Sequence, residues 1–228
     1  MSSIKQEFSR NARHYNQYNI IQKSVVAELI RTMPKKSKAI ADIGCGQGEV
    51  YAQLPWKTES FIAVDFAEGM CALHPRAPEI QVIQGDFNDP DLFSRLMREP
   101  LNRVVSASAL QWSVDLEKTF ALIASIGKPV SLALFTSNTF ASLHERLGVH
   151  SPLYGPKMIL DLAQKYFHAQ TFIKRYHLDF DSTQELLQYI KRSGVSSGYR
   201  RSGITSLREL IRDNTLRSID AEVVFIVN

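Results

Sequence analysis

Residues 39–48 read AIADIGCGQG, and this stretch decides the fold of the 228-residue chain. Its first half is apolar except for Asp42 and predicts a short strand, while the glycines that follow predict a tight turn into a helix. Glycines at alternate positions remove the Cβ groups that would keep a ligand away from the turn, and the turn's amides are expected to form an electropositive pocket. The spacing G-x-G-x-G differs from the G-x-G-x-x-G of dinucleotide-binding turns, and a plain strand-to-helix connection is the alternative.

The composition is that of an ordinary globular protein, with 44% hydrophobic and 22% charged residues. A chain of this length is expected to form one α/β domain. Its apolar runs fall short of the roughly 20 residues of a membrane span, and its first residues lack the apolar segment of a secretory signal. The two cysteines, Cys45 and Cys71, give no disulfide framework, so we expect a cytoplasmic protein.

The charge is mildly basic, with a net value of +4 and an isoelectric point of about 9.0. Such a balance suits an acidic partner, either an acidic protein or nucleic acid, although solubility alone also explains it. The cysteine and histidine residues show no zinc-type spacing, so no metal is predicted.

Apolar runs alternate with helical patterns along most of the chain. Strands are predicted at 39–43, 61–65, 80–84, 103–106 and 130–135, separated by helices at 47–54, 66–73, 90–97 and 116–125. Such alternation predicts a parallel sheet covered by helices on both faces. Next come a helix at 156–167, an antiparallel edge strand at 171–180, helices at 182–193 and 206–214, and a final strand at 221–227. The predicted fold is therefore α/β, with a doubly wound, mostly parallel seven-stranded sheet.

The other segments are expected to cap or cover this sheet. Helical patterns at 3–17 and 21–33 predict N-terminal helices that form a cap over residues 1–34. Residues 138–155 break the alternation and are expected to form a small lid insertion, and residues 182–215 to serve as a further lid or substrate-docking element. All of these segments belong to a single predicted domain, 1–228.

The second predicted strand ends in an acid, Asp65, which lies 23 residues after Asp42. A carboxylate at this place can accept hydrogen bonds from both vicinal hydroxyls of a ribose, and the spacing is near that of a ribose-binding acid. Asp65 is therefore a candidate nucleoside-binding residue. The alternative role is an N-cap for the helix that follows, and the two roles are compatible.

The string D-I-G-C-G-Q-G at residues 42–48 resembles motif I of the class I S-adenosylmethionine (SAM) methyltransferases. Gly-Asp-Phe at 85–87 resembles the motif in which the acid and the next residue of that family bind adenine, although Asp86 is also placed to cap the helix at 90–97. The resemblance implies a SAM cofactor. The cofactor-binding residues it implies are Asp42, Gly44, Cys45, Gly46, Gly48, Asp65, Phe66, Asp86, Phe87, Ser106 and Ala107.

Three further stretches are similar to one branch of this family. They are F-S-R-N-A-R-H-Y at 8–15 followed by Gln22, S-A-S-A-L-Q-W at 106–112, and L-L-Q-Y-I-K-R-S-G-V at 186–195. Together they resemble the malonyl-[acyl-carrier protein] O-methyltransferases of biotin synthesis over nearly the whole chain. The sequence departs from that pattern before the fifth strand, where the usual P-G-G is Lys128-Pro129-Val130, and in a short 138–155 segment. These departures concern the lid and the acceptor rather than the cofactor.

That branch methylates a malonyl carboxylate, which is ionised at neutral pH and needs no general base. The resemblance implies that Tyr15, Gln111 and Trp112 orient the carboxylate, although Tyr15 and Trp112 are equally suited to packing. It also implies an acidic acyl-carrier protein as partner, and a basic docking surface formed by Lys191, Arg192, Arg200 and Arg201. A plain solvated face is the alternative for these four residues.

Three other functions stay open at this stage. A methyltransferase for a small free carboxylic acid, such as an aconitate-like one, would need an arginine inside the pocket. An RNA methyltransferase would suit the isoelectric point, but the chain shows no aromatic and basic stacking surface, so nucleic acid is not the expected partner. A SAM-binding protein without catalysis is the third.

Overall fold

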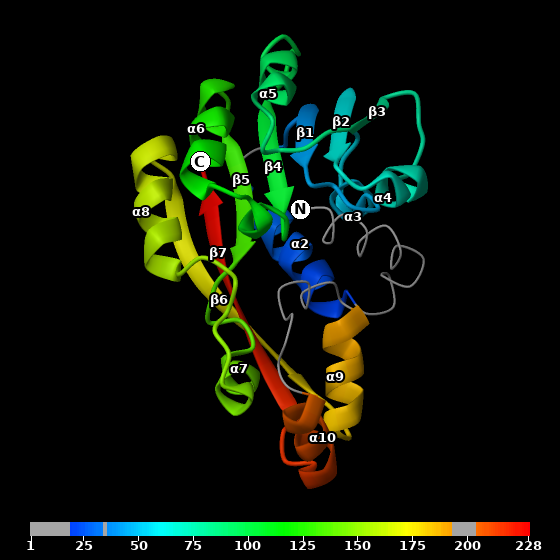
Figure 1. Ribbon diagram of the computed structural model, residues 1–228. Coiled ribbons are helices and arrows are strands. Elements are labelled where there is room, and N and C mark those ends of the chain that lie inside the picture. The colour runs from blue at the N-terminus through cyan, green and yellow to red at the C-terminus, as the bar shows by residue number, and fades with distance from the viewer. Residues whose placement is uncertain (1–18, 34–35, 193–203) are drawn as a thin grey trace.

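The computed structural model describes the backbone of residues 19–33, 36–192 and 204–228. Its centre is a seven-stranded sheet with the order β3-β2-β1-β4-β5-β7-β6 (Figure 1). The strands are β1 Ala39–Ile43, β2 Ser60–Asp65, β3 Ile80–Gln84, β4 Arg103–Ala107, β5 Val130–Phe135, β6 Gln170–Asp179 and β7 Ser218–Val227. The first five pair in parallel, whereas β7 runs antiparallel to both of its neighbours. The predicted fold class is confirmed.

Helices follow the strands in the predicted alternation. They are α2 Ile20–Thr32, α3 Glu49–Gln53, α4 Glu68–Leu73, α5 Pro90–Leu96, α6 Leu116–Ser125, α7 Ala141–Leu147, α8 Pro156–Phe167, α9 Thr183–Arg192 and α10 Ile204–Asp213, with a 3-10 turn η1 at Leu110–Trp112. The bounds lie within a few residues of those expected from periodicity. The helix predicted at 3–17 lies outside the described residues.

Neighbouring residues of each strand point to opposite faces of the sheet, as β geometry requires. Ile40 and Phe61 face a cluster that contains the apolar stripe of α2. Ala41 and Ile62 face a second cluster, which contains the buried residues of α5, α6 and α8. The strands are therefore apolar on both sides, which explains their near-continuous apolar runs.

The strand predicted at 171–180 is β6, which lies at the edge of the sheet and runs antiparallel to its neighbour, as expected. The final strand was expected to close the sheet, but β7 lies inside it, between β5 and the edge strand β6. Residues 223–227 of β7 pair with β5, whereas 218–222 pair only with β6. The antiparallel pair of β6 and β7 therefore extends past the parallel strands.

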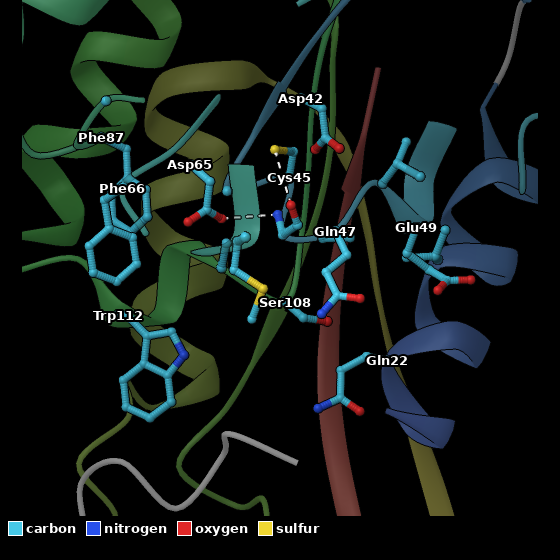
Figure 2. Close-up of a pocket in the computed structure, with 18 of the residues that line it drawn as sticks. Gln22, Asp42, Cys45, Gln47, Glu49, Asp65, Phe66, Phe87, Ser108 and Trp112 are labelled. Atoms are coloured by element: carbon cyan, nitrogen blue, oxygen red, sulfur yellow. Dashed lines mark hydrogen bonds between the residues drawn. The ribbon is translucent and has the colours of Figure 1, made fainter. Parts of the chain in front are cut away.

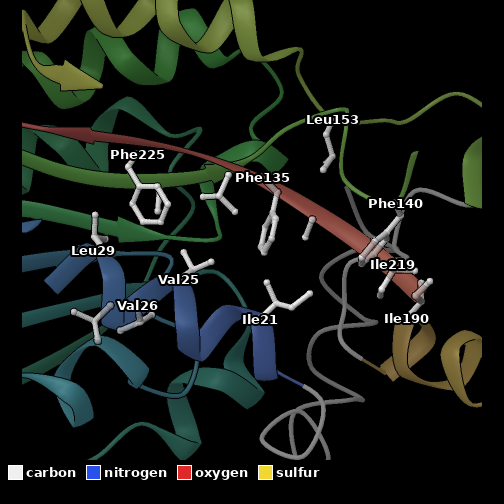
Figure 3. Packing of buried hydrophobic residues seen from close by; sticks show 14 of the residues in the cluster. Ile21, Val25, Val26, Leu29, Phe135, Phe140, Leu153, Ile190, Ile219 and Phe225 are labelled. Atoms are coloured by element: carbon white, nitrogen blue, oxygen red, sulfur yellow. The ribbon is translucent and has the colours of Figure 1, made fainter. Parts of the chain in front are cut away.

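A helical lobe packs on this extension. Leu186, Tyr189 and Ile190 of α9 are buried together with Ile219 of β7. Figure 3 shows Ile190 and Ile219 at one end of a row of side chains that continues through Phe135 to the α2 stripe. The α9 helix is thus held by the main core of the molecule.

The segment expected as a lid, 138–155, is tied to the sheet at both ends. The amide of Ser137 donates to the carbonyl of Tyr154 at 2.9 Å, and the Tyr154 hydroxyl donates to the carbonyl of Ser113 at 2.9 Å. The amide of Phe140 donates to the carbonyl of Asp220 at 2.8 Å. Within the described residues, no helix is long and apolar enough to cross a membrane.

Candidate cofactor and active site

A cavity of about 420 Å³ opens at the carboxyl ends of β1 to β4, where the strand order reverses direction. This crossover is the usual ligand site of doubly wound sheets. Figure 2 shows the side chains that surround it. The lining residues are Asn19, Gln22, Val26, Asp42, Gly44, Cys45, Gly46, Gln47, Glu49, Val50, Asp65, Phe66, Met70, Gln84, Gly85, Asp86, Phe87, Asn88, Ala107, Ser108, Ala109 and Trp112.

The glycine turn lies on one side of the cavity, but most of its amides are already bonded within the protein. The amides of Gly44 and Cys45 both donate to the carbonyl of Val64, at 2.8 and 2.9 Å. The amide of Gly46 donates to Asp65 Oδ2 at 2.9 Å, and that of Gly48 to the carbonyl of Cys45 at 2.9 Å. The expectation that these amides form an electropositive pocket is therefore wrong for these four.

A different steric constraint favours glycine at each of the three positions of the turn. All three have positive φ, at 76°, 54° and 89° for Gly44, Gly46 and Gly48. A Cβ on Gly44 would lie 2.2 Å from the Cβ of Ala109, so this glycine lets the loop after β4 approach the turn. A Cβ on Gly46 would meet nothing within 4 Å, and this residue lines the cavity.

Gly48 does not line the cavity, and its role in cofactor binding stays a prediction. A Cβ there would lie 2.7 Å from Pro75 and 2.8 Å from His74 Nε2. Gly48 therefore lets the start of α3 pack against the loop after α4.

Asp42 is fully buried at the end of β1, and neither of its carboxylate oxygens has a hydrogen-bond partner within residues 19–33, 36–192 and 204–228. Burial, followed by the nearby charge of Asp65, raises the pKa of Asp42 from 3.8 to about 8. Burying an ionised carboxylate costs free energy unless a cation or a hydrogen-bond donor lies against it. The residue lines the cavity, so a cationic ligand group would satisfy it.

Asp65 fastens the glycine turn. Its Oδ2 accepts from the amide of Gly46, and its Oδ1 accepts from the amide of Ala67 at 2.8 Å. The N-cap of α4 is Ala67, without any side-chain cap, so the helix-capping alternative for Asp65 is wrong. Two hydrogen bonds leave acceptor capacity on this carboxylate, which lines the cavity.

Asp86 forms a local turn after β3. Its Oδ1 accepts from both the amide and the side chain of Asn88, at 2.9 and 2.7 Å. Helix α5 is capped by Asp89, which accepts from the amide of Asp91 at 3.0 Å, so the capping alternative for Asp86 is also wrong. Figure 2 shows Phe66 and Phe87 on the same side of the cavity as Asp65.

Two residues expected in the site lie outside the cavity. The Ser106 hydroxyl donates to the carbonyl of Ile43 at 2.6 Å inside the sheet, and the residue is buried. The Gln111 side chain is also buried and donates to the carbonyl of Ser108 at 2.7 Å. Neither residue lines the cavity, whereas Ala107 and Trp112 do, and the roles of Ser106 and Gln111 at the site stay predictions.

The sequence analysis missed several lining residues. Gln22 lies on the buried face of α2 among Ile21, Val25 and Val26, and a polar residue on an otherwise apolar stripe was the available signal. Ser108 carried no such signal, because its position depends on a backbone φ of 60°. The other missed polar residues of the lining are Asn19, Gln47, Glu49, Gln84 and Asn88.

Several predicted residues lie outside the described part of the chain. These are Tyr15, Arg200 and Arg201, as well as the side chain of Arg192. Lys191 is described and exposed, near the end of α9.

The charge of the described lining is acidic. Asp42, Glu49, Asp65 and Asp86 contribute carboxylates, and the described lining holds no lysine, arginine or histidine. Such a wall suits a cationic ligand and opposes a pyrophosphate. Among the residues that the structure describes, no group of three His, Cys, Asp or Glu side chains is placed to hold a metal ion.

Residues 41–135 match a known family, described as a methyltransferase domain. Over these residues the chain is similar to that family. The matched region begins at β1 and ends with β5, so it includes the glycine turn and every strand that borders the cavity.

Several curated relatives have the same enzyme name. A malonyl-[acyl-carrier protein] O-methyltransferase of Acetivibrio thermocellus is 31% identical over 62% of this chain and 52% of that protein. One of the same name from Chlorobium luteolum is 24% identical over 87% of this chain and 80% of that protein. The chain spans about half the length of several curated relatives it matches, as with the 55% of the Bacillus anthracis protein.

Solved structures agree on the fold. A methyltransferase attributed to an antibiotic biosynthesis pathway of Anabaena variabilis superposes with a TM-score of 0.64, over 90% of this chain and 97% of that chain, at 18% identity. This structure therefore shares the fold of the chain. The family match, the names of the relatives and the solved structure are all those of methyltransferases.

Proposed function

We propose that this chain transfers a methyl group from SAM to the free carboxylate of a malonyl thioester on acyl-carrier protein, in biotin synthesis. The observation that carries the proposal is the acidic cavity beside the glycine turn, with the buried carboxyl group of Asp42, which lacks a hydrogen-bond partner in the described part of the chain. The names of the curated relatives support this acceptor.

The described residues suit SAM. Asp42 would meet the ammonium of its amino-acid end, and the open space at Gly46 would admit that end. Asp65 would accept from the ribose hydroxyls, and Asp86 from the adenine amine, with Phe66 and Phe87 against the ring. When bound, SAM supplies a methyl group that its sulfonium charge has already activated, so the protein mainly has to position the reactants.

A carboxylate acceptor suits the described lining because it arrives ionised and needs no general base. The titratable lining groups are four carboxylates and Cys45, and burial raises the pKa of the Cys45 thiol well above its usual value. Trp112 would form an apolar wall beside the acceptor and help to exclude water.

The charge of the lining also favours a thioester over a free dicarboxylic acid. A malonyl thioester brings one negative charge into a cavity lined by four carboxyl groups, of which Asp42 is largely neutral near pH 7 until a cation binds, whereas free malonate brings two charges. Like charges at close range are unfavourable, and the effect grows where water is excluded. We further propose that the carrier protein docks on Lys191 and Arg192 at the end of α9, together with Arg200 and Arg201 from the stretch that follows α9 in the sequence.

The test is transfer of label from methyl-labelled SAM to a panel of malonyl-carrier protein, malonyl-CoA, free malonate and bulk tRNA. We expect base-labile label on the malonyl thioesters and little on free malonate. The Asp65→Ala variant should lose transfer by about 100-fold, because it removes a cavity carboxylate and leaves the Gly46 amide unsatisfied.

Asp89→Ala is the matched control. It also removes a carboxylate that accepts from a backbone amide, but Asp89 caps α5 outside the cavity. This variant should keep transfer close to the level of the unaltered protein. Label on tRNA alone, or preferential labelling of free malonate, would overturn the proposed acceptor.

A further inference from the structure

Ser108 has a conformation that residues with a Cβ rarely adopt. Its φ is 60°, in the left-handed region, although glycine is the residue that usually occupies this region. Backbone strain of this kind persists only where the surroundings hold it in place, and it is often found at functional sites. The question is therefore what holds Ser108 and what the conformation achieves.

Two hydrogen bonds hold the backbone of Ser108 from opposite sides. Its amide donates to the carbonyl of Ala133 in β5 at 2.9 Å. Its carbonyl accepts from Gln111 Nε2 at 2.7 Å, and Gln111 is 4% exposed. The neighbouring Ala109 packs against Gly44, where a Cβ would come within 2.2 Å. The loop after β4 is thus clamped to β5, to its own 3-10 turn and to the glycine turn.

The side-chain hydroxyl of Ser108 takes no part in these hydrogen bonds. Ser108 lines the cavity, and its Oγ is buried without a hydrogen-bond partner among the described residues. Ser106, two positions earlier, differs from Ser108, because its hydroxyl donates a hydrogen bond to the carbonyl of Ile43. A hydroxyl that is held in a cavity wall and lacks a partner is free to donate to a ligand.

The strand order indicates which part of a ligand the hydroxyl would meet. Asp65 and Asp86 follow β2 and β3, on one side of β1, whereas Ser108 and Trp112 follow β4, on the other side. If the nucleoside occupies the β2 and β3 side, as proposed above, the β4 side is left for the acceptor. Figure 2 shows Ser108 between Trp112 and Gln47 at the cavity wall.

The geometry points to Ser108 as a catalytic residue that donates a hydrogen bond from its hydroxyl to the acceptor carboxylate, with Gln111 as the residue that positions it. This inference rests on the proposed function. A single neutral donor orients the carboxylate but leaves its second oxygen available to react. Because the carboxylate loses negative charge during methyl transfer, the hydrogen bond stabilises bound acceptor at least as much as the transition state.

Ser108→Ala removes the hydroxyl and keeps the Cβ. We expect the KM for malonyl thioester to rise about tenfold with kcat within about twofold, as for loss of one hydrogen bond to a charged group. The dissociation constant for S-adenosylhomocysteine, measured by calorimetry, should stay unchanged. Ser108→Gly removes the hydroxyl and also the left-handed strain, so an equal rise in KM would show that the hydroxyl, and not loop geometry, is responsible.

Ser113→Ala is the matched control. Its hydroxyl is also buried, in the same loop, without a partner in the part of the chain that the structure describes, but Ser113 does not line the cavity. This variant should leave KM unchanged. Gln111→Leu should raise KM as Ser108→Ala does, and the double variant Ser108→Ala/Gln111→Leu should show no further rise, because both changes remove the same contact.

Two results would overturn the inference. One is weaker binding of S-adenosylhomocysteine in Ser108→Ala, which would place the hydroxyl against the cofactor. The other is an unchanged KM. If the unaltered protein transfers no methyl to malonyl thioesters, the proposed function fails by itself. Ser108 is then tested by titrating malonyl-pantetheine into protein loaded with S-adenosylhomocysteine, where equal binding by Ser108→Ala or no binding at all counts against it.

Discussion

The parallel strands β1 to β5 and the antiparallel pair of β6 and β7 are built differently although they share one sheet. Each of the first five has five or six residues, and the turns after β1 to β4 supply most of the cavity wall. Strands β6 and β7 have ten residues each, and β6 alternates between exposed and half-buried positions along the edge. The comparison teaches that tight backbone approach is needed where strands end at the cavity, whereas the edge strand β6 mainly needs side chains that pack on one face.

Gly44→Ala should have the largest effect on stability, because it acts where the two turns meet. The new Cβ would lie 2.2 Å from the Cβ of Ala109, and φ is 76°. Left-handed strain and overpacking together predict a loss of about 2–5 kcal/mol in the free energy of unfolding. Urea unfolding measures this loss, and binding of S-adenosylhomocysteine should be lost with it.

Gly127→Ala provides the comparison for Gly44. Gly127 has a similar φ of 67°, but a Cβ there would meet nothing within 4 Å, and the residue lies outside the cavity. Its substitution should therefore cost only the conformational part, about 1 kcal/mol. Equal losses for the two variants would show that the approach of Ala109 to the glycine turn contributes nothing.

The same contrast explains which features could be predicted from the sequence. The strands β1 to β5 follow from local apolar runs, and Asp42 and Asp65 follow from their places at strand ends. Ser106 and Gly48 were predicted as cofactor contacts, but their roles depend on Ile43 and on His74, which are distant in the sequence. Periodicity identifies a strand at β7 without its neighbours, so its place between β5 and β6 was missed.

Asp42 should make cofactor binding depend on pH. Burial raises the pKa of Asp42 to about 8 in the folded protein. The neutral form of this carboxyl group stabilises the free protein fully below the pKa that Asp42 has in the unfolded chain, and this stabilisation is lost as the pH rises to about 8. A cationic ligand requires the ionised form. Affinity for S-adenosylhomocysteine, relative to Asp42→Asn, should therefore increase by up to about tenfold per unit between about pH 6 and about pH 8.

Calorimetry in buffers of different ionisation enthalpy checks this prediction, because binding should release a proton from Asp42. The ratio to Asp42→Asn removes the titration of the ligand's own amine, which both proteins share. Asp115→Asn, at the N-cap of α6, should behave like the unaltered protein. A ratio that stays constant with pH would mean that Asp42 is not the group that meets the ligand's cation.

Lys174→Ala, on the edge strand β6, should have the smallest effect. Lys174 pairs with Glu28 of α2 at 2.8 Å, but the lysine side chain is 43% exposed. Glu28 also keeps its hydrogen bond from Arg31, which is the main cause that lowers the pKa of Glu28. We expect the free energy of unfolding to fall by less than about 1 kcal/mol, or a Tm shift of about 2 °C or less, and this loss should shrink with added salt.

Lys157→Ala, which removes an exposed pair with Asp161 on α8, should cause a loss of the same size as Lys174→Ala. A loss in the free energy of unfolding as large as that of Gly44→Ala would show that packing around β6 is as sensitive to substitution as packing at the cavity turns. The contrast between the two parts of the sheet would then fail.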